Sequence, residues 1–206
     1  LHGRIVEAIE TLYPDRLIEQ VERLAHHAAR GEVWDKAVIY LRQAGAKADA
    51  RSAIREAASY FEQALTALGH LPESRETQEQ AIDVHFSLRV SLGALGERER
   101  VLEHLRAAEA LANTLGDERR LARVNAFIAR LLLTQREYEQ AVTAGERGIG
   151  MARTLDDYSL EVLTNNILGL AYYCLGNYPK AVEALRPYLV PLDGPLVRER
   201  FGGLGL

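Results

Sequence analysis

The chain has 206 residues, of which 48% are hydrophobic, so it is long enough to bury a continuous core. Its 29 acidic and 25 basic residues are scattered along the whole length and give a formal net charge of −4, which excludes the concentrated positive surface that nucleic acids require. No stretch reaches the roughly 20 uninterrupted apolar residues of a membrane helix, and the single cysteine, Cys174, excludes an internal disulfide and fits a reducing, cytoplasmic compartment.

Apolar residues recur at three-and-four spacing between prolines and glycines along the chain, which predicts helices and no strands. Pro14 and Pro179 suit first helical turns, and Asp117 and Asp157 can cap free backbone N–H groups. We expect about ten helices, near residues 2–12, 15–29, 33–49, 52–68, 75–94, 98–114, 118–134, 138–154, 159–175 and 178–190.

A repeat is visible where the second helix of each expected pair begins. Val101, Ala141 and Ala181 follow similar segments, which start at Gly96, Arg136 and Gly176, and successive copies are 40 residues apart. Each interval covers a helix, a tight turn and a second helix. A constant interval of this kind predicts a solenoid of stacked antiparallel helix pairs, because each pair hides its apolar face only against its neighbour.

The last copy resembles a tetratricopeptide (TPR) repeat. The resemblance is carried by Asn165-x-x-Leu168-Gly169-x-x-Tyr172 and Gly176-Asn177-Tyr178-x-x-Ala181, with Asn165 in place of the usual large residue. An earlier copy places Gly45, Ala57, Phe61 and Ala64 at matching spacing. The resemblance implies an all-α, right-handed α-solenoid of TPR-like helix pairs.

The N-terminal part resembles the segment that follows the ATPase domain in bacterial class III adenylate/guanylate cyclases of the cyclase–ATPase–TPR type. The residues that carry this resemblance are His2-Gly-Arg-Ile-Val-Glu-Ala-Ile-Glu, Leu24-Ala-His-His-Ala and Ala37-Val-Ile-Tyr-Leu-Arg-Gln-Ala-Gly-Ala-Lys-Ala. Related transcriptional regulators carry similar segments. We therefore expect residues 1–30 to follow a missing ATPase domain, residues 31–72 to form atypical TPR-like helix pairs, and residues 73–206 to form 40-residue repeats that are truncated at the C-terminus.

The histidines and the cysteine give no sign of a metal or catalytic site. Adjacent His26 and His27 point about 100° apart on a helix, whereas zinc-binding helices place ligands three or four residues apart, so we expect one ring in the helix interface and one at its edge. His85 and His104 look isolated. No histidine or lysine stands near Cys174 in the sequence, which predicts a packed, inert thiol.

The segment Gly145-Glu-Arg-Gly148-Ile-Gly150 resembles a phosphate-binding glycine run only superficially. It lacks a preceding strand and a Gly-Lys-Ser/Thr ending. We expect Gly145 and Gly148 to serve close helix packing instead. The sequence thus predicts no catalytic residue, no cofactor and no metal site, and the fragment is not expected to be an enzyme.

The concave face of the predicted solenoid is the expected binding surface, because the first helices of the pairs turn inward there. The candidate groove-binding residues are Phe86, Arg123, Arg130, Asn166 and Tyr173. The arginines and Asn166 could grip an acidic or C-terminal peptide. An alternative reading leaves the arginines solvated or paired with Glu161 and its neighbours.

The sequence therefore favours a non-catalytic protein–protein interaction and regulatory scaffold in a larger cytoplasmic signalling protein, most like a nucleotide cyclase with an ATPase module. Its partners would be a protein or peptide in the groove and the ATPase or output domain of the same protein. Two alternatives stay open. One is a small-ligand sensor domain of an ATPase-type transcriptional regulator, in which Phe86 and Tyr173 stack on the ligand. The other is a homodimer formed through exposed ends.

Overall fold

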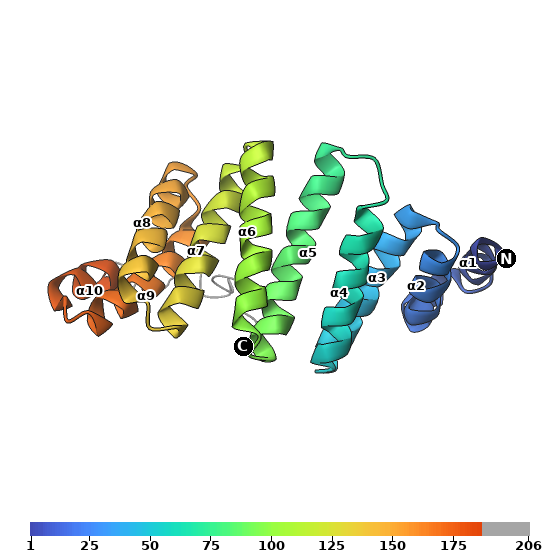
Figure 1. Ribbon diagram of the computed structural model, residues 1–206, viewed down its shortest axis with the longest axis horizontal. Coiled ribbons are helices and arrows are strands. Elements are labelled where there is room, and N and C mark those ends of the chain that lie inside the picture. The colour runs from blue at the N-terminus through green and yellow to red at the C-terminus, as the bar shows by residue number, and fades with distance from the viewer. Residues whose placement is uncertain (187–206) are drawn as a thin grey trace. The chain divides into compact units, whose positions relative to one another are not determined.

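The computed structural model describes residues 1–186, and every regular element in that part of the chain is helical. The predicted all-α class is therefore confirmed there. None of these helices is long and apolar enough to cross a membrane. The α-helices are α1 (His2–Leu12), α2 (Val21–Arg30), α3 (Trp34–Ala50), α4 (Ile54–Leu68), α5 (Arg75–Ala94), α6 (Arg98–Leu115), α7 (Glu118–Thr134), α8 (Tyr138–Thr154), α9 (Tyr158–Cys174) and α10 (Tyr178–Leu185), and the one 3-10 helix is η1 (Pro14–Gln20) (Figure 1).

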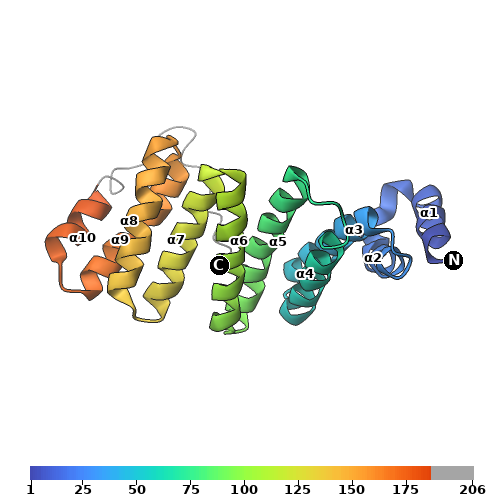
Figure 2. The ribbon, with the colours of Figure 1, turned by 45° about the horizontal axis from the view of Figure 1, so that its top comes forward.

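Contacts between helices divide the chain into two units, Leu1–Ala107 (unit 1) and Ala108–Leu206 (unit 2). In unit 1, each helix from α1 to α4 packs against the next α-helix. In unit 2, α7, α8, α9 and α10 do the same, and α7 also contacts α9, so these helices lie side by side (Figure 2). The contact between α7 and α9 joins the first helices of two successive pairs. Such a contact arises when one pair stacks on the next, and it confirms the predicted solenoid class.

The boundary between the two units falls inside α6. The sequence pattern places its divisions elsewhere, after residues 30 and 72. The divisions at residues 30 and 72 separate segments with different repeat patterns, whereas the two units are defined by contacts. The sequence divisions stay predictions.

The turns repeat together with the helices. Residues just after a helix adopt a left-handed conformation, which lets the chain reverse direction in a short turn. Glu32 and Ser52 do so 20 residues apart in unit 1, with φ of 55° and 60°. Every twentieth residue from 96 to 176 does the same: Gly96 (77°), Gly116 (62°), Arg136 (65°), Asp156 (51°) and Gly176 (75°). The half-repeat of 20 residues is thus one helix and one turn.

Side-chain caps fix where several helices begin. The Asp117 carboxylate accepts a hydrogen bond from the backbone N–H of Arg120 at 2.9 Å, and Asp157 accepts one from Leu160 at 3.1 Å, as predicted. Asn177 caps α10 in the same way, through the N–H of Lys180 at 3.3 Å. Each cap satisfies a backbone donor that the helix itself leaves without a partner.

Glycines let paired helices approach closely. A Cβ atom added to Gly45 on α3 would lie 2.6 Å from Phe61 on α4, and one added to Gly169 on α9 would lie 2.5 Å from Leu185 on α10. In both pairs the large residue follows the glycine by 16 positions. The same close contact in both pairs supports the register of the earlier TPR-like copy.

Gly145 and Gly148 of α8 also serve packing, as expected. A Cβ atom on Gly145 would lie 2.7 Å from the Leu168 side chain on α9, and one on Gly148 would lie 3.3 Å from backbone atoms of α7. A Cβ atom on Gly150 would meet nothing within 4 Å. Gly145 and Gly148 are therefore helix-contact residues rather than parts of a phosphate loop.

The predicted helix over 15–29 is wrong in its extent. The structure forms η1 and then α2, because Arg16 has the non-helical angles φ −130° and ψ 25°. Lys47 on α3 holds this bend, since its ammonium donates to the Ile18 carbonyl at 3.0 Å and to Glu22 at 2.9 Å. At the other end, α10 is described as far as Leu185, and residues 187–190 of the predicted last helix lie outside the described residues.

Candidate functional site

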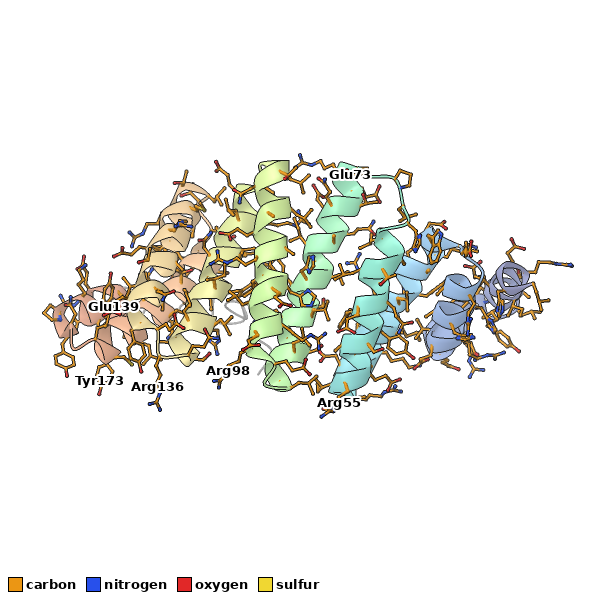
Figure 3. The ribbon with its side chains drawn as sticks, in the orientation of Figure 1. Arg55, Glu73, Arg98, Arg136, Glu139 and Tyr173 are labelled. Carbon is orange, nitrogen blue, oxygen red and sulfur yellow. The ribbon has the colours of Figure 1, made fainter. Side chains whose placement is uncertain are left out.

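Large apolar side chains gather on one face of α9 and α10 in unit 2. Leu170 and Tyr173 on α9 are 49% and 61% exposed, and Tyr178 and Val182 on α10 are 59% and 52% exposed. Figure 3 shows Tyr173 projecting outward from its helix. These four residues form what we call the α9–α10 surface. With Asn166, Gly169, Ala181 and Leu185 they line a cavity of about 540 Å³.

Local sequence places these side chains together. The lining residues on α9 recur at three-and-four spacing from Asn166 to Tyr173, and those on α10 recur in the same way from Tyr178 to Leu185, so each helix presents a single stripe. The turn at Gly176 brings the ends of the stripes together, and the Tyr173 and Tyr178 rings meet edge to face with centroids 5.7 Å apart.

A polar contact beside this cavity holds α8, α9 and α10 together. The Tyr172 hydroxyl donates to Glu146 on α8 at 2.6 Å, and the Lys180 ammonium lies 5.1 Å from the centroid of the Tyr172 ring. Burial and the hydrogen bond to Glu146 raise the pKa of Tyr172 to about 12, so the phenol stays protonated and keeps donating. Tyr172 also packs in a cluster with Ile149, Leu168 and Ala181.

The predicted groove residues of unit 2 lie on α7 and α9. Asn166 and Tyr173 are both exposed and line the same cavity, as their seven-residue spacing requires. On α7, Arg123 is exposed with its guanidinium 6.0 Å from the Phe127 ring centroid, and Arg130 is half-buried. The Arg153 guanidinium forms an ion pair with the Glu161 carboxylate at 3.2 Å. The binding role of these residues stays a prediction.

The remaining candidate, Phe86, is 8% exposed on α5 in unit 1. Its ring is therefore buried, which leaves little surface for a ligand. The sequence analysis did not identify Tyr178 and Val182 as candidate binding residues. It expected only the first helix of each pair to line the groove, and α10 is the second helix of its pair.

Two histidines that look isolated in the sequence form a pair in unit 1. The Nδ1 atoms of His85 on α5 and His104 on α6 are 3.0 Å apart, and His85 is 9% exposed. Burial and the neighbouring His104 lower the pKa of His85 to about 4, and burial also lowers the pKa of His104. The expectation of isolated rings is wrong, because helix packing brings together residues that are 19 positions apart.

Two further expectations concern His27 and Cys174. His27 is partly buried and its Nδ1 atom lies 2.8 Å from that of His2, while His26 is exposed, which confirms one ring in the helix contact and one at the edge. Cys174 is exposed, so the predicted packed thiol is wrong. It stands at the end of α9, where the helix periodicity turns it away from Tyr172 and the core.

Comparison with known proteins supports the fold. No protein-family model and no curated protein matches the sequence. A solved structure described as BtubC (BKLC) from P. vanneervenii superposes with a TM-score of 0.68 at 19% identity, covering 90% of this chain and 86% of that one. The MamA protein aligns over 87% of this chain and 99% of its own, at 14% identity and a TM-score of 0.43. The BtubC likeness agrees with the helix pairs described above and shows an all-α helical repeat fold.

Proposed function

We propose that this chain is a non-catalytic scaffold that binds other proteins, and that the α9–α10 surface is a contact site. The observation that carries the proposal is the gathering of four large, half-exposed apolar side chains around one cavity. Water contact with apolar surface costs about 25 cal/mol per Å². Clustered apolar side chains that stay exposed on a folded chain often mark a site where another protein binds.

In this proposal the neighbouring helix α7 gives the surface a charged border. Arg123 and Arg130 lie seven residues apart on α7, which packs against α9. Seven residues are two helical turns, so both side chains leave the same face of α7. Guanidinium groups bind carboxylates through paired hydrogen bonds, and the proposed partner therefore has an acidic or carboxyl-terminal segment beside its apolar one.

The regulatory part of the proposal is that the array belongs to a larger cytoplasmic signalling protein with an ATPase module and a nucleotide cyclase output domain. The resemblance of residues 2–48 to the segment after such ATPases supports it. Partner binding would then shift the populations of array conformations and bias the output. Cyclase activity of the whole protein that does not change when the array is deleted would contradict this part.

Capture from an extract of the source organism tests the binding role. The wild-type chain and two variants, Leu170→Glu and Val182→Glu, are immobilised, and retained proteins are quantified by mass spectrometry. Ile39→Glu is the matched control, because Ile39 is also 52% exposed but lies on α3 in unit 1. We expect a protein that wild type and Ile39→Glu retain equally and both surface variants lose. Equal retention by all four chains would contradict the proposal.

A further inference from the structure

A further cavity lies in unit 1, between α2 and α4. Both of these helices pack against α3, which lies between them (Figure 1). The cavity has a volume of about 250 Å³, and its lining residues come from α2, α3 and α4. All of them belong to unit 1, so the cavity shares no residue with the α9–α10 surface.

Local spacing gives α2 and α4 one lining stripe each. The stripe of α2 is His26, Ala29 and Arg30, and that of α4 is Gln63, Thr66 and Ala67. In both helices the second and third residues follow the first by three and four positions, a spacing that places side chains on one face of a helix. The two stripes therefore border the cavity from the two sides of α3.

The helix α3 supplies an aliphatic floor and an aromatic wall. Leu41 lines the cavity and is 1% exposed, as expected of a residue at its floor. Trp34, the first residue of α3, is partly buried and also lines the cavity. The ring of His70, just beyond α4, stacks on the Trp34 ring with centroids 4.0 Å apart and planes 10° apart. This stack limits the rotation of the indole and so fixes the wall.

The polar groups of the lining favour an anion that also carries hydrogen-bond donors. Arg30 is exposed, forms no ion pair with any residue that the structure describes, and has no carboxylate beside it in the lining. Its guanidinium can donate two parallel hydrogen bonds to a carboxylate. On α4, the Thr66 hydroxyl donates to the Glu62 carbonyl at 3.1 Å, and the Gln63 amide nitrogen donates to the Ser59 carbonyl at 3.2 Å. The side-chain oxygens of Thr66 and Gln63 keep lone pairs that can accept from a ligand.

We infer that this cavity binds a small organic carboxylate that has an apolar group and an N–H or O–H donor beside the carboxylate. The carboxylate binds Arg30, and the donor binds the oxygens of Gln63 and Thr66. The apolar group lies on Leu41, beside Trp34. Pockets for drug-sized ligands have volumes of roughly 300–1,000 Å³, so a cavity of about 250 Å³ suits a ligand of the size of an amino acid. α-Amino and α-hydroxy acids with apolar side chains have all three groups. The inference goes beyond the proposed scaffold role and does not depend on it.

Tryptophan fluorescence of the full chain tests the inference, because Trp34 is the only tryptophan and lines the cavity. The probes are L-leucine, L-phenylalanine and 2-hydroxy-4-methylpentanoate. The carboxamide of each probe is the ligand control, since it keeps the apolar group and the donor but lacks the negative charge. We expect at least one probe to change the emission saturably with a Kd of about 1 mM or tighter, and its carboxamide to cause no saturable change. Isothermal titration calorimetry repeats the titrations with a readout that does not depend on the indole.

Variants then locate the binding. Arg30→Gln should weaken it by about tenfold or more, because it removes a charged hydrogen-bond donor, and Thr66→Val should weaken it by about threefold through the loss of one neutral acceptor. Arg55→Gln is the matched control and should change the Kd by less than about twofold. Arg55 is exposed on α4 but does not line the cavity, and Figure 3 shows it projecting outward. Circular dichroism checks that every variant keeps its helices.

The inference is overturned if no probe binds by fluorescence or calorimetry. Equal affinity for a probe and its carboxamide would show that the carboxylate is not recognised, and equal weakening by Arg30→Gln and Arg55→Gln would place the binding elsewhere. The tripeptide alanyl-alanyl-leucine has the same carboxylate at a peptide end. If it binds about tenfold tighter than L-leucine, the cavity receives a peptide end and not a free acid, and the inference is wrong. None of these results bears on the α9–α10 surface, which the capture experiment tests.

Discussion

At the residue scale, α5, α7 and α9, the first helices of successive pairs, each bury a polar side chain at the same position of the repeat. His85, Asn125 and Asn165 follow one another at 40-residue intervals and are 9%, 1% and 4% exposed. The two asparagine amides each donate to the carbonyl group four residues earlier in the same helix, at 2.9 and 3.0 Å. His85 instead pairs with His104 on the next helix, and from this pair we predict a stability that depends on pH.

Acidification should destabilise the fold through His85. Its pKa is about 4 in the folded chain and near its ordinary value of 6.5 in the unfolded chain, so between these values the unfolded chain binds more protons. The stabilising contribution is complete above pH 6.5 and is lost as pH falls toward 4. Between pH 7 and pH 5 the free energy of unfolding should drop by about 2 kcal/mol from this group.

Urea unfolding at the two pH values measures this drop. His85→Asn copies the residue that Asn125 and Asn165 place at the equivalent position, and it should remove most of the change. His104, with Arg100, Glu62 and Glu103 around it, stays in the variant and contributes the remainder. An equal pH dependence in wild type and His85→Asn would show that the pair is not the cause.

The turn at Arg136 offers a second test at this scale. Its φ of 65° places a side chain in the left-handed region, which costs about 1–2 kcal/mol for most residues other than glycine. Gly96 and Gly176 stand at the same turn of the neighbouring repeats. Arg136→Gly should therefore raise the free energy of unfolding by about 0.5–1 kcal/mol, after the entropic cost of glycine.

Gly176→Ala is the opposite change at an equivalent turn and should lower stability by about 1 kcal/mol. Thermal and urea unfolding of both variants give the two values. A loss of stability in Arg136→Gly would mean that the arginine side chain contributes more than its backbone conformation costs.

Sequence reasoning succeeds at this scale where a residue acts within its own helix. The caps formed by Asp117 and Asp157 depend only on neighbours three residues away, and both were predictable. The His85–His104 pair depends on the rotation of two helices about their axes, which the local pattern does not define. Cys174 was misassigned because its apolar neighbours were treated as one packed group, although adjacent helical residues point in different directions.

At the element scale, the helices follow from composition and periodicity because most begin and end at local signals. Prolines, capping aspartates and the recurring turn residues are all visible in the sequence. The segment 15–29 is the exception. Its break at Arg16 is stabilised by Lys47, which belongs to a later helix, and a contact between helices cannot be read from local spacing.

Two glycines of α8 test whether close packing or helix propensity controls this element. Gly145→Ala would place a methyl group 2.7 Å from the buried Leu168 side chain, and we expect it to lower the free energy of unfolding by about 1–2 kcal/mol. Gly150→Ala has open space around it and should raise stability by about 0.5–1 kcal/mol.

Urea unfolding of the two variants gives both free energies in the same helix. The opposite signs are the expected signature, because only Gly145 lies against α9. Stabilisation by both substitutions would mean that Leu168 moves aside at little cost and that Gly145 is not required for stacking.

At the scale of the whole molecule, the stacked repeat was predictable because three equally spaced helix starts are enough to define a period. The proposed contact surface was predictable in part. Asn166 and Tyr173 come together because they share a face of α9, whereas Phe86 is buried. Tyr178 and Val182 were missed, since their exposure depends on which face of α10 remains uncovered by a neighbouring helix.

Hydrogen–deuterium exchange of the full chain, with and without the protein captured from the extract, tests the central claim most directly. The account predicts slower amide exchange in α9 and α10, over residues 166–185, when the partner is bound, and unchanged exchange in α1 to α4. Protection restricted to unit 1, or no change in α9 and α10 at saturating partner, would contradict the assignment of binding to the α9–α10 surface.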